Sequence, residues 1–247
     1  MSAVSKVKVP LTTSPRFQKE AAEIALQMSQ FSVDELERLL RVNAKIAVEN
    51  YKRYQAFHAE TTPELPALLA YTGIVFKRLN PKDFSAEDFG YAQEHLRLTS
   101  FCYGLLRPLD VIRAYRLEGD VVLPELGNQT LFSYWRSRLT DTFIEDIRSA
   151  GGILCNLASD EMKSLFDWKR VESEVRVVTP EFHVWKNGKL ATIVVYTKMS
   201  RGEMTRFILK NKIGNPEELK GFSWEGFEFD ESLSDERKLV FINGMGE

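Results

Sequence analysis

Residues 96–118 read LRLTSFCYGLLRPLDVIRAYRLE, and the turn-forming residues of this stretch organise the chain around it. Gly104 is expected to end a helix, because only glycine enters the left-handed conformation beyond a helix C-terminus at little cost. Pro108 disfavours helix at the residue before it and can open a new helix. The pattern predicts a helix, a tight connection over residues 104–107, and a second helical or extended piece over residues 110–115.

The helix that runs into this stretch has a clear predicted start. Ser85 can cap its first turn, and Asp88 places a carboxylate near the free N–H groups three residues later. Phe89, Ala92 and Leu96 recur at helical spacing and mark one apolar stripe. We therefore expect a helix that begins at Ser85.

Four arginines mark the same stretch, Arg97, Arg107, Arg113 and Arg116, and Asp110 is the one acid that precedes Arg116. A turn leaves backbone N–H groups free, and Arg107 lies beside them, so the connection is a plausible phosphate clamp. The alternative is a buried helical hairpin whose arginines pair with acids elsewhere in the chain. Residue spacing leaves both alternatives open.

Several stretches together resemble one known family. Leu96-Arg97, Ser100, the run from Tyr103 to Asp110 and the run from Tyr115 to Glu118 resemble the signature of the bacterial YaaA peroxide-stress family. The resemblance extends to residues 156–159 (NLAS), 200–208 (SRGEMTRFI) and 221–227 (GFSWEGF), and it follows nearly the whole chain in order. It implies a cytoplasmic protein that limits free intracellular iron during peroxide stress. It also implies a double-stranded-DNA binder with a helix-hairpin-helix element in a mixed α/β fold.

Two features depart from the family pattern. Helix-hairpin-helix turns usually read Gly-apolar-Gly, and Leu106 stands where the second glycine is expected. Family members usually open with a short strand and a Ser-Pro-Ala-Lys-Thr-like turn, whereas this sequence starts where that turn would be ending. We therefore expect the full-length product to begin upstream of Met1.

The charge of the chain is unevenly distributed. The 247 residues are 44% hydrophobic and 28% charged, which is typical of a globular protein with a sizeable core. The formal net charge of −2 excludes a uniformly basic protein, so a nucleic-acid site must depend on local charge. Residues 186–220 carry a net charge of +5, and residues 222–247 carry −5.

Several site classes lack a sequence signal. Cys102 and Cys155 form no CxxC pair and are expected to be reduced, buried thiols. The three histidines, His58, His95 and His183, have no metal-ligand spacing, and there is no phosphate-binding or dinucleotide-binding glycine motif. No run of 18 apolar residues predicts a membrane span. We expect no cofactor, no metal site and a cytoplasmic location.

Periodicity and capping residues predict most of the other elements. Helices are expected over residues 15–30, 32–57, 129–149 and 203–212, and near Asn215, with Ser32 and Glu35 forming a capping box. Strands are expected over residues 121–123, 153–155, 224–229 and 239–242. The apolar run 70–76 is predicted to be a strand or an extended turn.

The clearest β signal lies at residues 173–198. Asn187-Gly188 separates two apolar runs, and this dipeptide suits a two-residue hairpin turn because both turn positions need a positive φ. Residues 193–196 read IVVY, which predicts a central strand covered on both faces.

Asn156 and Ser159 follow the predicted strand 153–155 and precede a predicted helix, with Ser159 as its N-cap. A strand end that leads into a helix N-terminus is a natural ligand position. Asn156 and Ser159 are therefore either ligand-binding residues or simple turn and cap residues.

The combined prediction is a mixed α/β fold with one compact domain over residues 1–247, in which helices and a helix-hairpin-helix-like element surround a mixed sheet. The predicted DNA- or anion-binding residues, expected to line one cleft, are Arg97, Tyr103, Gly104, Arg107, Arg113, Arg116, Asn156, Ser159, Lys198, Arg201 and Arg206. The resemblance favours a non-enzymatic, double-stranded-DNA-binding stress protein. The alternative is an enzyme for a small anionic or nucleotide-like substrate, in which Tyr103, Ser159 or Glu118 would act.

Overall fold

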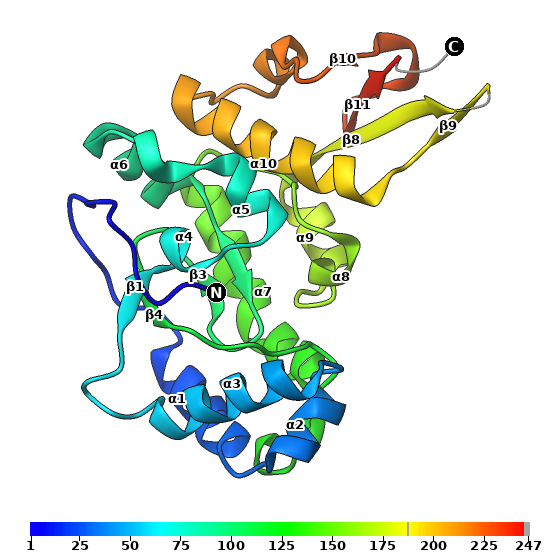
Figure 1. Cartoon of the computed structure of the whole chain (residues 1–247). Helices are drawn as coiled ribbons and strands as arrows, with labels where there is room; N and C mark the ends of the chain where they lie inside the picture. The colour runs from blue at the N-terminus through cyan, green and yellow to red at the C-terminus, as the bar shows by residue number, and fades with distance from the viewer. Residues whose placement is uncertain (187, 245–247) are drawn as a thin grey trace. The chain divides into compact units, whose positions relative to one another are not determined.

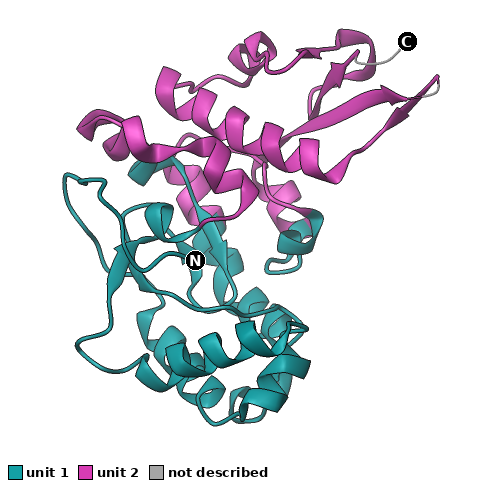
Figure 2. Ribbon diagram, in the orientation of Figure 1, with its two compact units in different colours: residues 1–71, 92–143, 160–168 teal, residues 72–91, 144–159, 169–247 magenta. Residues whose placement is uncertain are grey.

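The structure is a computed structural model that describes residues 1–186 and 188–244 (Figure 1). The fold is mixed α/β, as predicted. The chain divides into two compact units, each of which is described by itself (Figure 2). Unit 1 contains residues 1–71, 92–143 and 160–168, and unit 2 contains residues 72–91, 144–159 and 169–247. The single domain stays a prediction.

Unit 1 is mainly helical around a buried aromatic and aliphatic core. Its helices are α1 (Gln18–Met28), α2 (Val33–Leu39), α3 (Ala44–Ala56), α4 (Ala67–Ala70), α8 (Asp160–Lys163) and part of α7 (Leu131–Ser149), and it holds the 3₁₀ helix η2 (Pro124–Leu126). Trp135 of α7 is fully buried and donates from Nε1 to the Phe101 carbonyl over 2.8 Å. This bond satisfies the polar edge of the largest buried side chain of the unit.

The strands of unit 1 form three small antiparallel pairs. They are β1 (Glu64–Pro66) with β4 (Val111–Arg113), β2 (Leu98–Ser100) with β3 (Gly104–Leu106), and β5 (Val122–Leu123) with β6 (Gln129–Thr130). The β1–β4 and β2–β3 pairs contain residues 98–100, 104–106 and 111–113 of the signature stretch.

Unit 2 contains the main sheet, in the order β10 (Phe227–Phe229), β11 (Lys238–Asn243), β8 (Arg176–Lys186) and β7 (Ile153–Cys155), with β9 (Lys189–Ala191) also paired to β8. β8 runs parallel to β7 and β11 and antiparallel to β9. The helices α5 (Ile74–Leu79) and α10 (Val194–Asn211) lie wholly in this unit. It also holds most of α9 (Trp168–Glu174), part of α6 (Ala86–His95) and the end of α7, and the 3₁₀ helices η1 (Pro81–Asp83), η3 (Pro216–Gly221) and η4 (Glu231–Leu233).

One hydrophobic core joins the sheet of unit 2 to α10. Val178, Phe182 and Val184 of β8 pack with Phe241 of β11 and Met204 of α10. Alternate residues of β8 face this core, because successive side chains of a strand point to opposite faces.

The predicted helix through residues 96–104 is wrong, and so is the helix-hairpin-helix-like element built on it. Helix α6 ends at His95, and the β2–β3 hairpin follows. Arg97 Nη1 donates to the Gln93 and Glu94 carbonyls at the end of α6 and thereby helps to terminate the helix. Gly104 does have a positive φ of 68°, but it lies at the start of β3 and does not end a helix. A Cβ at this position would lie 2.7 Å from the Trp135 ring.

The predicted central strand 193–196 is also wrong. Helix α10 begins at Val194, and the Val194 and Val195 side chains are exposed. A short apolar run cannot be assigned to strand or helix by periodicity alone, and here it opens an 18-residue helix. The prediction of a strand or an extended turn over residues 70–76 is wrong for the same reason. This run contains the end of α4 and the start of α5.

Local capping signals were the most accurate predictions. Ser32 with Glu35 and Asn215 with Glu218 form complete capping boxes, and Ser85 exchanges two hydrogen bonds with Asp88. The predicted helix 32–57 is two helices, because the chain breaks between α2 and α3. The predicted strands at residues 121–123, 153–155, 224–229 and 239–242 correspond to β5, β7, β10 and β11.

Candidate nucleic-acid interface

The predicted phosphate clamp at Arg107 is occupied by a side chain of unit 1. Asp110 is 1% exposed and accepts hydrogen bonds from the Arg107 amide over 2.8 Å and from Arg107 Nη2 over 3.1 Å. The same carboxylate accepts a 2.6 Å bond from the Thr13 hydroxyl. The turn amide that the sequence suggested for a phosphate is therefore used internally.

The other signature arginines also contact groups of unit 1. Arg113 forms an ion pair with Glu64 over 3.0 Å and donates to the Phe57 carbonyl. Arg116 pairs with Glu118 over 2.9 Å. The second alternative left open by the sequence, arginines that pair with acids elsewhere in the chain, is thus found for Arg113, although not in a helical hairpin. Arg107 and Arg116 pair with Asp110 and Glu118 of the same stretch. Their role in phosphate binding stays a prediction.

Tyr103 lies in a buried hydroxyl network. Its hydroxyl accepts a 3.0 Å bond from the Arg113 amide, and its own amide donates to the Ser100 hydroxyl. Ser100 in turn contacts the Tyr115 hydroxyl over 2.6 Å, and Tyr115 contacts Tyr71 over 2.8 Å. Burial raises the pKa of Tyr103 well above its ordinary value and that of Tyr71 to about 12, so these phenols stay neutral near pH 7.

The basic residues at the C-terminal end of α10 are held by acids of unit 2. Arg206 meets both carboxylate oxygens of Asp83, with Nη1–Oδ1 at 2.9 Å and Nη2–Oδ2 at 2.5 Å. Lys210 and Lys212 both contact the Asp88 carboxylate. Arg206 is therefore a structural cation that fastens α10 to η1 and the preceding turn.

Three lysines of unit 2 are arranged differently. Lys186, Lys189 and Lys198 are exposed, and within residues 1–186 and 188–244 none of them forms an ion pair. The sequence from residue 182 to residue 202 contains no Asp or Glu. These three ammonium groups are consequently available to an external anion.

Lys186 and Lys189 were not among the predicted site residues. They are direct partners across the β8–β9 pair, and Gly188 between them has a φ of 71°. This register fits the predicted two-residue turn, although Asn187 lies outside the described residues. The Asn-Gly signal could have located this lysine pair, because a two-residue turn places the residues that flank it opposite each other.

Asn156 Nδ2 and Ser200 Oγ are buried polar groups of unit 2 that have no hydrogen-bond partner among the described residues. Asn156 Oδ1 accepts a 3.3 Å bond from the Ala158 amide. Buried polar atoms are normally satisfied, so each orphan is a point where a ligand atom would be stabilised. Ser159 is half-buried just before α8, and Arg201 follows Ser200 on α10.

The predicted cleft residues thus come from different units. Arg97, Tyr103, Gly104, Arg107, Arg113 and Arg116 lie in unit 1, whereas Asn156, Ser159, Lys198, Arg201 and Arg206 lie in unit 2.

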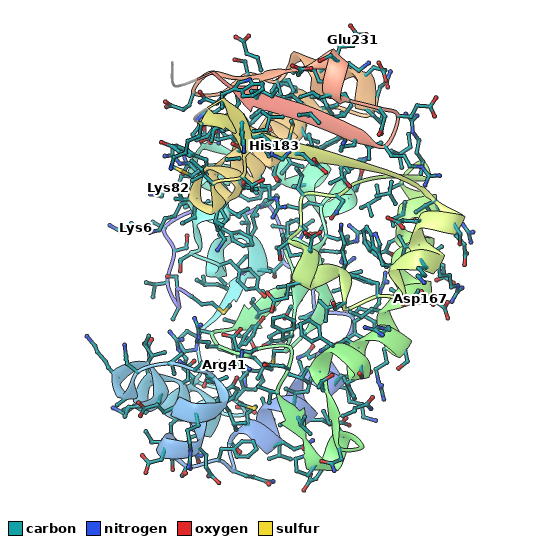
Figure 3. The ribbon with its side chains drawn as sticks, turned by 90° about the vertical axis from the view of Figure 1, so that its right-hand side faces the viewer. Lys6, Arg41, Lys82, Asp167, His183 and Glu231 are labelled. Atoms are coloured by element: carbon teal, nitrogen blue, oxygen red, sulfur yellow. The ribbon has the colours of Figure 1, made fainter. Side chains whose placement is uncertain are left out.

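Unit 2 also holds a cavity of about 240 Å³ that contains none of the predicted residues. Its wall carries two basic residues, Arg176 and Lys220, and a larger number of acids, Glu217, Glu231 (labelled in Figure 3), Asp235 and Glu236.

Cys102 and Cys155 are free thiols, as predicted, but only Cys102 is buried, and Cys155 is half-buried. Burial raises the pKa of Cys155 to about 12 and that of Cys102 further.

Across the described part of the chain, no group of three or more metal-ligating side chains is assembled. No described helix is both long and apolar enough to cross a bilayer.

Comparison with known proteins gives a consistent match. A family model described as peroxide stress protein YaaA matches residues 1–233. A UPF0246 protein of Bacteroides fragilis is 78% identical over 247 residues, which cover 100% of this chain and 96% of that protein. UPF0246 proteins of Phocaeicola vulgatus and Clostridium beijerinckii are 63% and 38% identical, over 98% and 94% of this chain and 94% and 90% of their own lengths.

Proposed function

Because the chain belongs to the YaaA family of peroxide stress proteins, we propose that it is a non-enzymatic protein of the peroxide stress response that binds double-stranded DNA. In this proposal the protein acts in the cytoplasm and helps to limit free intracellular iron. Both of these roles rest on the family resemblance.

One observation carries the DNA-binding proposal, the set of three unpaired lysines on an acid-free segment. Lys186, Lys189 and Lys198 are exposed and have no ion pair within residues 1–186 and 188–244. Duplex DNA presents closely spaced phosphates, and lysines that neutralise them release bound counterions. Phosphates are the same at every base step, so binding through these lysines tolerates any sequence.

The proposal predicts a salt dependence of defined size. Three neutralised phosphates give a slope of about −2.7 for log K against log salt concentration. The double variant Lys186→Gln/Lys189→Gln should reduce this slope to about −0.9 and weaken binding to unrelated duplexes alike. Fluorescence-anisotropy titrations at several salt concentrations measure both quantities.

Lys82→Gln is the matched control, because Lys82 is an exposed lysine of the same unit that lies outside the acid-free segment (labelled in Figure 3). It should leave the slope unchanged. Absence of binding at low salt, or binding that does not respond to the double variant, would refute the proposed interface.

A second candidate function is favoured by the orphaned groups Asn156 Nδ2 and Ser200 Oγ. Each of these groups would stabilise a hydrogen-bond acceptor of a small ligand, such as a phosphate or carboxylate compound, as the enzyme alternative requires. Inorganic phosphate and nucleoside monophosphates can be tested by calorimetry at physiological salt. Binding that Asn156→Ala abolishes, and that duplex DNA does not displace, would favour this candidate.

A further inference from the structure

The β8–β9 hairpin extends past the end of the neighbouring strand β11. The last residue pair between β11 and β8 is Asn243 with Val184, whereas β8 continues to pair with β9 through Trp185 and Lys186 (Figure 1). Among the described residues, two residue pairs, Trp185 with Leu190 and Lys186 with Lys189, thus form a two-stranded ribbon with no third strand beside it. At about 3.4 Å per residue this ribbon extends about 7 Å before its turn.

The two faces of the ribbon differ in chemistry. Val184 is buried in the core of unit 2, so the next side chain, Trp185, points to the opposite face. Leu190 is the direct partner of Trp185 and lies on the same face. The two side chains are 42% and 37% exposed, an unusual exposure for a cross-strand tryptophan–leucine pair.

The other face of the ribbon carries Lys186 directly opposite Lys189. Like charges in directly opposed positions destabilise an antiparallel pair. Within the described residues no carboxylate forms an ion pair with either lysine, so none of these residues relieves the repulsion. A phosphate group near the two ammonium groups would relieve it.

From this arrangement we propose that the ribbon tip enters a groove of duplex DNA, where Trp185 and Leu190 wedge between base pairs and kink the duplex. The inference rests on the proposed DNA-binding function and adds a mode of contact to it. Two-stranded ribbons fit DNA grooves, and apolar side chains that insert between base steps bend the duplex by about 20–90°. The long, flexible stems of Lys186 and Lys189 let their ammonium groups reach the phosphates at the rims of the groove.

The charge of the tip favours DNA over an apolar protein partner. The segment that contains the tip has no acid from residue 182 to residue 202, and Lys198 adds a third exposed cation. Glu181 is the nearest preceding acid in the sequence, and it is paired with His183 over 3.1 Å. An aromatic side chain beside unpaired cations suits the base faces and phosphates of a nucleic acid.

The test measures the shape of the DNA and its affinity separately. A duplex of about 20 base pairs carries a donor and an acceptor dye at its two ends, and the full chain is titrated at low salt. Wild-type protein should raise the energy-transfer efficiency, because a kink brings the ends together. Trp185→Ala should leave the duplex straight and bind at least about fivefold more weakly, the lower end of the contribution of base stacking.

Three further variants separate a wedge from a structural role. Trp185→Phe should restore most of the bend, and Leu190→Ala should reduce it. Val194→Ala removes another exposed apolar side chain from the same segment but outside the ribbon, and should bend DNA like the wild type. Far-UV circular dichroism should show that every variant is folded.

The outcomes distinguish the wedge from the proposed function. If wild type binds DNA with the expected salt slope but leaves it straight, or if Trp185→Ala bends it equally, the wedge is refuted and DNA binding stands. Absence of any DNA binding refutes both. Sedimentation with vesicles of anionic and zwitterionic lipids is the parallel arm, and Trp185-dependent binding to vesicles without DNA bending would overturn the inference in favour of a membrane surface.

Discussion

At the scale of single residues, ion pairing distinguishes structural cations from available ones. Asp88 is buried and contacts Lys210, Lys212 and the Ser85 amide. Burial alone would raise the pKa of Asp88, but hydrogen bonds from the two lysines and from Ser85 outweigh it and hold the pKa well below its usual range. The charged form is therefore stabilised by folding.

This predicts a pH-dependent effect of Asp88→Asn. At pH 7 the variant should lose about 2 kcal/mol of unfolding free energy, the scale of hydrogen bonds to a charged group. Because the folded pKa is depressed, the carboxylate contributes fully above the unfolded pKa of about 4, and its contribution declines as the pH falls through the folded pKa. Urea unfolding at pH 7, 5 and 3 should show the gap between the two proteins shrink at pH 3, and a constant gap would contradict the prediction.

At the scale of elements, one glycine sets the distance between two helices. A Cβ at Gly202 of α10 would overlap the Val75 carbonyl of α5 and lie 2.7 Å from the Arg78 Cβ. Gly90 of α6 is the opposite case, with nothing within 4 Å of the same position. In an open helix, alanine is better than glycine by about 0.5–1 kcal/mol.

The two glycine-to-alanine variants should therefore change stability in opposite directions. Gly202→Ala should destabilise by about 1–3 kcal/mol, the usual cost of overpacking, whereas Gly90→Ala should be neutral or stabilising. Denaturation midpoints measure both. A stabilised Gly202→Ala would show that α5 and α10 are not packed as closely as described.

The elements also show which predictions the sequence could support. Capping boxes and the Asn-Gly signal depend on residues that are neighbours in the sequence. Ser32, Ser85 and Asn215 could therefore be identified as helix starts. The lysines on either side of residues 187 and 188 are direct partners, as a two-residue turn requires. The prediction for residues 193–196 is wrong because a short apolar run suits a strand and a helix equally. The prediction for residues 96–104 is wrong because burial against distant residues decides their conformation. Trp135, which packs against Gly104, lies 31 positions away in the sequence.

The sequence could show which segment of the candidate site is basic, but not which of its basic residues form ion pairs. The sequence located the basic segment 186–220, but it could not show that Asp83 and Asp88 engage Arg206, Lys210 and Lys212. These acids lie more than 100 positions before the basic residues that they bind. Only the fold distinguishes the paired residues Arg206, Lys210 and Lys212 from Lys186 and Lys189, which have no acidic partner among the described residues.

At the scale of the whole molecule, the two cysteines report on global unfolding. Burial raises the pKa of the Cys155 thiol to about 12 and that of Cys102 further, so few thiolates exist at pH 8. Native protein should react slowly with iodoacetamide, and protein in urea should gain two adducts rapidly. Intact-mass measurement over time distinguishes the two rates, and fast labelling under native conditions would show that one thiol is accessible.

The ribbon at the end of β8 also bears on the solubility of the protein. β9 is a three-residue strand that pairs only with β8 among the described strands, so its outer side offers free backbone groups to any other extended chain. Lysines at such an edge keep identical molecules apart by mutual repulsion. Lys186 and Lys189 should therefore oppose self-association, and neutralising them should increase light scattering by concentrated protein.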